Sequence, residues 1–281
     1  MHLTTQILKD IIKPRPEIAH KGTFGRVVLV GGDEQYGGAI LMSAEATINS
    51  GAGLTTVVTA KKNHAALHAR LPEAMVVDWT DYDAVVAVAA SADVLLVGPG
   101  LGTTAFSRLL LNQLLTMQKE TQYLLLDGSA LTLLGEQSPT LSYPKKTVLT
   151  PHQMEWQRVS GIPIEQQTVQ ANHHVQKNIG ATVVLKSHRT TIYGQKDIYQ
   201  NPGGSSAMSI GGTGDTLAGM IAGFLAQFPQ TDKTIAAAVF LHSYIGDYLA
   251  KENYVVLPTK ISAAIPYWMH FFSTKNDTTN L

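Results

Sequence analysis

The segment from Ile210 to Gly219 joins a glycine-rich turn to an acidic residue and then to an apolar helix. Glycines let backbone N–H groups approach a bound anion closely, and the first turn of a helix adds free donors and the positive end of its dipole. We predict that Gly212, Thr213 and Gly214 form an anion hole and that Asp215 is a catalytic base beside a transferring phosphoryl group. Most Asp residues at helix starts only cap the helix. A cap does not need the glycines that precede Asp215, so we favour the catalytic interpretation.

A basic cluster spans Lys186, Ser187, His188, Arg189 and Thr190. An Arg fork and a Lys point charge are both suited to phosphate recognition. A short basic run is more often a solvated turn. Here the run follows a predicted strand, where a parallel sheet binds its ligands, and this position favours phosphate binding.

The run Gly98-Pro99-Gly100-Leu101-Gly102 lies between a predicted strand and a predicted helix. Such glycines allow a phosphate or a sugar to approach the backbone, or they only make a tight turn. The spacing is not that of the dinucleotide fingerprint G-x-G-x-x-G, and the chain has no G-x-x-x-x-G-K-[ST] motif. A Rossmann dehydrogenase and a P-loop nucleoside triphosphatase are therefore disfavoured.

His152 follows another predicted strand, with Glu155 one helical turn further on. It is either a loop histidine with satisfied hydrogen bonds or a polar contact for a substrate. The chain has no cysteine, no H-E-x-x-H and no other metal-ligand spacing, so we predict no protein-caged metal. A serine nucleophile is also unsupported, because G-x-S-x-G does not occur.

Short β-branched runs alternate with segments of helical spacing, which is typical of a parallel α/β sheet. The predicted strands are 27–30, 54–59, 94–97, 123–126, 147–149 and 182–185. The predicted helices are 40–50, 106–118 and 167–179, with three more from about Thr213, Asp232 and Lys260. A turn within 192–199 predicts a hairpin at one edge. We expect a doubly wound, mostly parallel sheet flanked by helices, with residues 1–281 as a single domain.

Composition excludes several classes of function. The 21 basic and 21 acidic side chains cancel, so no net positive field attracts nucleic acid or an anionic membrane. With 44% apolar and 15% charged residues, the chain can bury a large core. We find no signal peptide and no long apolar span, and we expect a cytoplasmic protein.

Five motifs, in this order, resemble those of the ADP/ATP-dependent (S)-NAD(P)H-hydrate dehydratases of the ribokinase-like superfamily. They are Lys21–Arg26, Gly31–Asp33 with Tyr36–Ala39, Gly98–Gly102, Thr150–His152 with Glu155, and Gly211–Asp215. The resemblance covers roughly residues 20–270. It implies a ribokinase-like fold and a repair reaction, in which the S epimer of NADHX or NADPHX is dehydrated back to NADH or NADPH. The hydroxyl is phosphorylated by ADP or ATP and phosphate is then eliminated.

The resemblance also implies roles for individual residues. Asp215 is the base and Gly212 to Gly214 supply donors. Hydrate-binding positions match Ala39, Gly102 and His152, and Gly100 belongs with them; nucleotide-binding positions match Lys186 to Thr190 and Gly214. Mg²⁺ would enter with the nucleotide. The family further implies a homotetramer and a separate epimerase partner.

The chain differs from the usual family pattern at two places. It has Gln153-Met154 where members commonly carry Pro-Gly after the histidine, and Ser205-Ser206 in a segment that commonly reads Gly-Asn-Pro-Gly. Two other interpretations stay open: a kinase of thiazole or pyrimidine alcohols from the same superfamily, and a nucleotide-binding sensor without turnover. The sequence does not decide between ADP and ATP or between NADHX and NADPHX.

Overall fold

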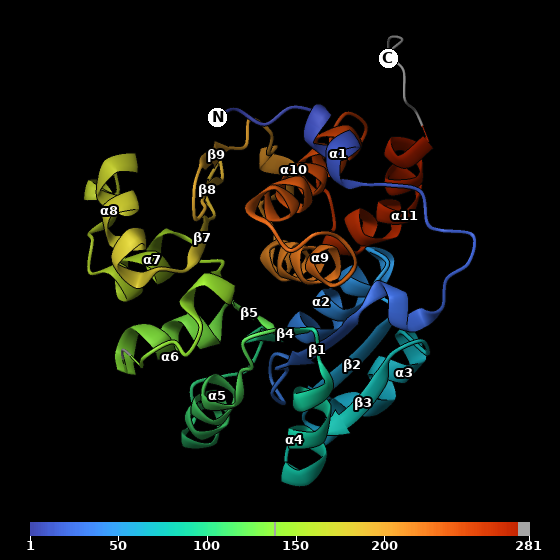
Figure 1. Cartoon of the computed structure of the whole chain (residues 1–281), viewed down its shortest axis with the longest axis vertical. Helices are drawn as coiled ribbons and strands as arrows, with labels where there is room; N and C mark the ends of the chain where they lie inside the picture. Colours follow the sequence, from blue (N-terminus) through green and yellow to red (C-terminus); the bar gives the residue numbers. More distant parts are fainter. Residues whose placement is uncertain (138, 275–281) are drawn as a thin grey trace.

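The computed structural model describes residues 1–137 and 139–274, which build one sheet of nine strands (Figure 1). The strand order is β3-β2-β1-β4-β5-β6-β7-β8-β9. Neighbouring strands from β3 through β7 are parallel, and β8 and β9 continue the sheet as an antiparallel hairpin. The strands are β1 (Arg26–Val30), β2 (Leu54–Thr59), β3 (Met75–Asp78), β4 (Val94–Val97), β5 (Tyr123–Leu126), β6 (Thr147–Leu149), β7 (Thr182–Leu185), β8 (Thr191–Tyr193) and β9 (Ile198–Gln200).

Helices cover both faces of the sheet, as Figure 1 shows. One face carries α1 (Gln6–Ile11), α2 (Gly37–Asn49), α3 (His64–Arg70), α9 (Thr213–Gln227), α10 (Asp232–Leu249) and α11 (Pro258–Thr274). The other face carries α4 (Tyr82–Ser91), α5 (Ala105–Met117), α6 (Ser129–Gln137), α7 (Gln153–Ser160) and α8 (Val169–Ile179).

Strand β1 shows why the apolar runs form central strands. Val27 and Leu29 pack into the core on the α9 side, whereas Val28 and Val30 pack into the core on the α5 side. Because successive side chains of a strand point to opposite faces, a strand buried on both faces has no polar alternation.

The predicted doubly wound, mostly parallel sheet is confirmed, including the six predicted strands, the hairpin and the predicted helices within about three residues. Strand β3 was not predicted. It is an edge strand whose side chains are exposed or half-buried, so its residues carry a weak apolar signal. The proposed single domain spans 1–281, of which residues 138 and 275–281 lie outside the described residues. In the described part of the chain, no helix is long and apolar enough to cross a membrane.

Helix α9 carries the predicted base and packs closely against α2. A Cβ at Gly219 would lie 2.1 Å from the carbonyl oxygen of Ser43, so only glycine permits this separation. Thr47 ties the two helices together by donating a 3.0 Å hydrogen bond to the carbonyl of Gly219. Helix α9 also contacts β1, β4 and β5. Helix α9 therefore lies over the point where the strand order reverses, between the parallel strands β1 and β4, which is a common ligand position in open α/β sheets.

Candidate active site at the carboxyl edge of the sheet

The N-terminus of α9 presents unpaired backbone donors. Gly212 precedes the helix with a φ of 96°, a left-handed conformation that favours glycine, and no side chain in the described part of the chain caps the helix. Among the described residues, the N–H groups of Gly214 and Asp215 have no hydrogen-bond partner. Thr213 turns its hydroxyl away from them and donates to the carbonyl of Met208 at 2.8 Å. Free N–H groups at a helix N-terminus are suited to binding an anion, which is the role that the sequence predicts for this turn.

Asp215 is a carboxyl group poised to accept a proton. Burial, followed by the charge of Asp127, raises its pKa to about 6, although Lys186 acts in the opposite direction. Its carboxylate makes no hydrogen bond to any residue that the structure describes. Its main chain is fixed, since Ser43 donates a 2.9 Å hydrogen bond to the Asp215 carbonyl. A side chain with this pKa is mostly ionised near neutral pH and is still a useful base.

Lys186 brings a positive charge to the same helix end. Its ammonium group donates a 2.7 Å hydrogen bond to Oδ1 of Asp127, which also accepts a 2.7 Å bond from the hydroxyl of Thr150. A Cβ at Gly214 would lie 3.1 Å from the Lys186 nitrogen. Burial alone would lower the pKa of Lys186. The surrounding carboxylates outweigh burial and raise that pKa, so the ammonium stays charged.

His152 begins helix α7 and is held by its own backbone. Its Nδ1 accepts hydrogen bonds from the N–H groups of Met154 and Glu155, both at 3.2 Å, and is therefore unprotonated. In return the N–H of His152 donates to Oε2 of Glu155 at 2.8 Å. Burial, followed by Lys186, lowers the pKa of His152, and burial raises the pKa of Glu155 to about 7. The His152 Nε2 lies 3.4 Å from Oε1 of Glu155, and 53% of the His152 side chain remains exposed to a ligand.

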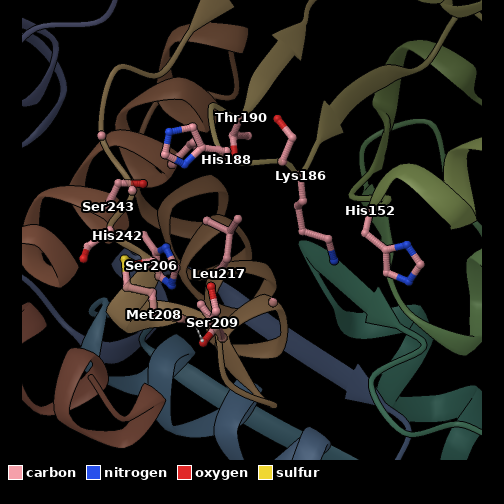
Figure 2. A pocket seen from close by; sticks show the side chains of 17 residues that line it. His152, Lys186, His188, Thr190, Ser206, Met208, Ser209, Leu217, His242 and Ser243 are labelled. Carbon is pink, nitrogen blue, oxygen red and sulfur yellow. Dashed lines mark hydrogen bonds between the residues drawn. The ribbon is translucent and has the colours of Figure 1, made fainter. Parts of the chain in front are cut away.

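A cavity of about 480 Å³ opens between β7 and α10. We call it the nucleotide cavity because most of the residues predicted to bind the nucleotide line it. Figure 2 shows His152 and Lys186 on one side of it and His242 and Ser243 of α10 on the other. The predicted site residues that line it are His152, Lys186, Ser187, His188, Thr190, Thr213 and Gly214. Arg189 is outside the lining, and its guanidinium donates a 3.2 Å hydrogen bond to the carbonyl of Gly204.

The remaining predicted residues lie on the other side of Asp215, toward β1 and β4. A Cβ at Gly100 would lie 3.2 Å from the Cβ of Ala39, so these two residues are neighbours. Gly102 lies beside the carboxylate of Asp33. Ser43 connects this group to the base, because its hydroxyl lies 3.2 Å from the Ala39 carbonyl and 2.9 Å from that of Asp215. The structure thus separates the predicted hydrate residues of this group from the nucleotide cavity.

Two functional candidates were not predicted from the sequence. Asp127 follows a predicted strand directly, but its hydrogen bond to Lys186 could not be predicted, because Lys186 lies 59 positions further along the chain. His242 lies within α10, where no local pattern marks it, yet it lines the nucleotide cavity. Its Nε2 has no hydrogen-bond partner among the described residues, and burial lowers its pKa to about 4. It is therefore neutral and can form a hydrogen bond with a bound ligand.

Comparison with known proteins supports the resemblance drawn from the motifs. Residues 27–267 match a family model described as NAD(P)H-hydrate dehydratase. The chain is 57% identical over 268 residues to the ADP-dependent (S)-NAD(P)H-hydrate dehydratase of Enterococcus faecalis, covering 95% of this chain and 92% of that protein.

Solved structures agree with that family. A ribokinase-like superfamily protein from Enterococcus faecalis superposes with a TM-score of 0.96 at 56% identity, covering 98% of this chain and 96% of the other. The ADP/ATP-dependent NAD(P)H-hydrate dehydratase of Bacillus subtilis, co-crystallised with ATP and Mg²⁺, superposes with a TM-score of 0.83 at 26% identity, covering 96% and 97%.

Proposed function

Because this chain belongs to the NAD(P)H-hydrate dehydratase family and has its ribokinase-like fold, we propose that it dehydrates the S epimer of NAD(P)H hydrate. It uses ADP or ATP, returns NAD(P)H and releases phosphate, and is therefore a nucleotide-dependent carbon–oxygen lyase. The observation that carries this proposal is Asp215, a half-buried carboxylate with a raised pKa beside unpaired N–H donors and the Lys186 ammonium.

Asp215 removes the proton that makes the hydrate hydroxyl a poor nucleophile. As the hydroxyl oxygen bonds to the terminal phosphorus, its proton passes to the Asp215 carboxylate and the bond to the nucleotide's bridging oxygen breaks. That oxygen keeps the electron pair and leaves as AMP or ADP. The phosphate on the hydrate then leaves with the electrons of its C–O bond, and loss of a proton from the adjacent ring carbon restores the double bond. Phosphate leaves more readily than water, so the nucleotide lowers the barrier.

The donors around Asp215 stabilise the charge that moves during transfer. The N–H groups of Gly214 and Asp215 and the ammonium of Lys186 surround the place where the phosphoryl oxygens would lie. Because these groups are already held by the helix and by Asp127, little reorganisation is needed at the transition state. We assign the nucleotide to the nucleotide cavity and the hydrate to Ala39, Gly100 and Gly102. His152, which lines the nucleotide cavity, is assigned to the place where the hydrate meets the nucleotide.

Mg²⁺ fits this site as part of the nucleotide. In the described residues no group of three or more His, Asp or Glu side chains is placed to hold a metal ion. Asp127 already accepts a hydrogen bond from the Lys186 ammonium, and Glu155 accepts one from the backbone N–H of His152. When bound to the phosphates, Mg²⁺ would neutralise their charge.

We further propose a cytoplasmic homotetramer that relies on a separate epimerase. Exposed apolar side chains in the loop before α11, those of Tyr254, Val255 and Leu257, are suited to a contact between subunits. The loop is close to the turn at Gly212 that begins α9, since a Cβ at Gly212 would lie 3.3 Å from Pro258. An epimerase is needed because the reaction uses only the S epimer, so the R epimer must first be converted.

A product assay separates this function from its two rivals. Purified protein with Mg²⁺ and ADP or ATP should restore dihydronicotinamide absorbance from the S hydrate and release one phosphate for each NAD(P)H formed. Phosphorylation of a hydroxyethylthiazole or hydroxymethylpyrimidine alcohol, without recovery of absorbance, would favour the vitamin-precursor kinase. Tight nucleotide binding with neither product would favour the sensor.

A further inference from the structure

A second cavity, of about 510 Å³, opens on the same edge of the sheet near the ends of β1 and β3, and we call it the Trp79 cavity. It shares no residue with the nucleotide cavity. The residues that line it are Asp33, Glu34, Gln35, Lys62, Trp79, Thr104 and Ser107. The catalytic steps described above use none of them.

The Trp79 cavity is connected to the catalytic base by a continuous series of contacts. Ser43 joins Asp215 to Ala39 by hydrogen bonds to both carbonyls, and Ala39 adjoins Gly100. The turn at Gly100 accepts a 2.6 Å hydrogen bond from the N–H of Asp33, whose side chain lines the cavity. These contacts place the Gly98–Gly102 turn between Asp215 and the Trp79 cavity.

The walls of this cavity provide an aromatic surface and polar groups. Trp79 is half-buried, and its ring packs against Phe106 with centroids 5.3 Å apart. In the described part of the chain, the Trp79 indole N–H has no hydrogen-bond partner. Oδ1 of Asp33 accepts hydrogen bonds from the N–H groups of Gln35 and Tyr36, whereas its Oδ2 accepts no hydrogen bond from a described residue. An aromatic base and a hydroxyl-bearing sugar are the ligand groups that match these walls.

We propose that the Trp79 cavity binds the adenosine end of the hydrate dinucleotide, with the base against Trp79 and the ribose at Asp33 and Glu34. This inference rests on the proposed function, because only a dinucleotide substrate has a second base to place. The nicotinamide end must lie at Asp215, and the phosphate donor occupies the cavity beside β7. The pyrophosphate then crosses the glycine turn, where the backbone approaches it without side chains.

The charges of the cavity favour a free 2′-hydroxyl over a 2′-phosphate. Lys62 forms an ion pair with Glu34 and is already neutralised, while Asp33 adds a further carboxylate. A carboxylate accepts a hydrogen bond from a ribose hydroxyl but repels a phosphate. The structure therefore assigns NADHX, rather than NADPHX, as the preferred hydrate.

Truncation of the substrate tests where the adenosine lies. Trp79→Ala should raise the KM for NADHX about tenfold, the usual cost of losing a base–aromatic stack. Its kcat and its KM for ADP should stay within twofold of the wild type. With the hydrated form of reduced nicotinamide mononucleotide, which lacks adenosine, wild type and variant should have equal KM values. Trp79→Phe should recover most of the loss, and Tyr82→Ala, an exposed aromatic outside the cavity, should behave as wild type.

Glu34→Gln tests the charge assignment. It frees Lys62 from its partner and should lower the KM for NADPHX relative to that for NADHX at least threefold. An equal rise in KM for the dinucleotide and mononucleotide hydrates in Trp79→Ala would overturn the adenosine assignment, as would a rise confined to ADP. An unchanged NADPHX to NADHX ratio in Glu34→Gln would overturn the preference. Wild-type protein that leaves every hydrate unchanged would instead reject the proposed function itself.

Discussion

The ammonium of Lys186, at the end of β7, donates a 2.7 Å hydrogen bond to the carboxylate of Asp127, at the end of β5. Asp127 is only 2% exposed, and Thr150 at the end of β6 holds the same carboxylate oxygen. Three neighbouring strand ends thus fix one positive charge beside the first turn of α9. A flexible lysine is a weak electrostatic catalyst unless something limits its motion, and here Asp127 does so.

Removing the charge of Asp127 should therefore impair the phosphoryl-transfer step. We expect Asp127→Asn to lower kcat/KM for the hydrate about ten- to a hundredfold, because a charge-assisted hydrogen bond contributes about 1.5–3 kcal/mol. Thr150→Val, which keeps the ion pair and removes only the hydroxyl, should lower it less than about threefold. Steady-state kinetics with both variants decides this. Equal losses would mean that Asp127 only supports the local fold.

The pH dependence of the reaction should follow the ionisation of Asp215. Burial and Asp127 raise the pKa of this carboxyl to about 6, and only its ionised form accepts a proton. We expect kcat/KM to rise with pH, to reach half its maximum near pH 6 and to level off above about pH 7. Glu155 also has a raised pKa, of about 7, so Glu155→Gln is the control. The kcat/KM of Glu155→Gln should still reach half its maximum near pH 6. If kcat/KM of this variant no longer fell at acidic pH, the fall in the wild type would be due to Glu155.

Asp215 should make the protein less stable at alkaline pH. Its folded pKa, about 6, is above its ordinary value of 3.8, so the folded state binds the proton more tightly than the unfolded chain. The resulting stabilisation is complete below about pH 4 and is lost as the pH rises through 6. We expect Asp215→Asn to increase the free energy of unfolding by about 1–2 kcal/mol at pH 8, and by little at pH 4.

Urea unfolding at the two pH values measures this difference. Asp83→Asn is the matched control, because Asp83 lies in the first turn of α4 on the exposed surface and should change stability by only a few tenths of a kcal/mol. If Asp215 acted only through its charge in the first turn of the helix, Asp215→Asn would lower the stability by about 0.3–1 kcal/mol at pH 8. The sign of the change thus distinguishes a functional carboxylate from a structural one.

The sequence predicted the sheet well because its central strands are buried on both faces. Runs such as Val94–Val97 have no polar alternation, and glycine clusters follow them directly. Strand β3 and the short helix α1 carry too few buried apolar residues to show a period. The edge strand could be recognised only from its pairing with β2, which is a tertiary property.

The site was predictable where its residues follow strands or start helices. Asp215, Lys186 and His152 occupy such positions, and the order of the strands brings them to one edge. The pairing of Lys186 with Asp127 was not predictable, because it requires knowing that β5, β6 and β7 are neighbours. His152 as a helix cap was missed for a chemical reason, since Ser, Thr, Asp and Asn are the residues normally expected there.

The turnover of Asp215→Asn with the S epimer of hydrated NADH, ADP and Mg²⁺ is the most direct test of the central claim. We expect a folded variant whose affinity for ADP stays within about twofold of the wild type, while its kcat falls by roughly two to four orders of magnitude. Calorimetry supplies the affinity, and the return of dihydronicotinamide absorbance supplies kcat. A folded variant that binds ADP and regenerates NADH at a near-normal rate would show that Asp215 is not the base.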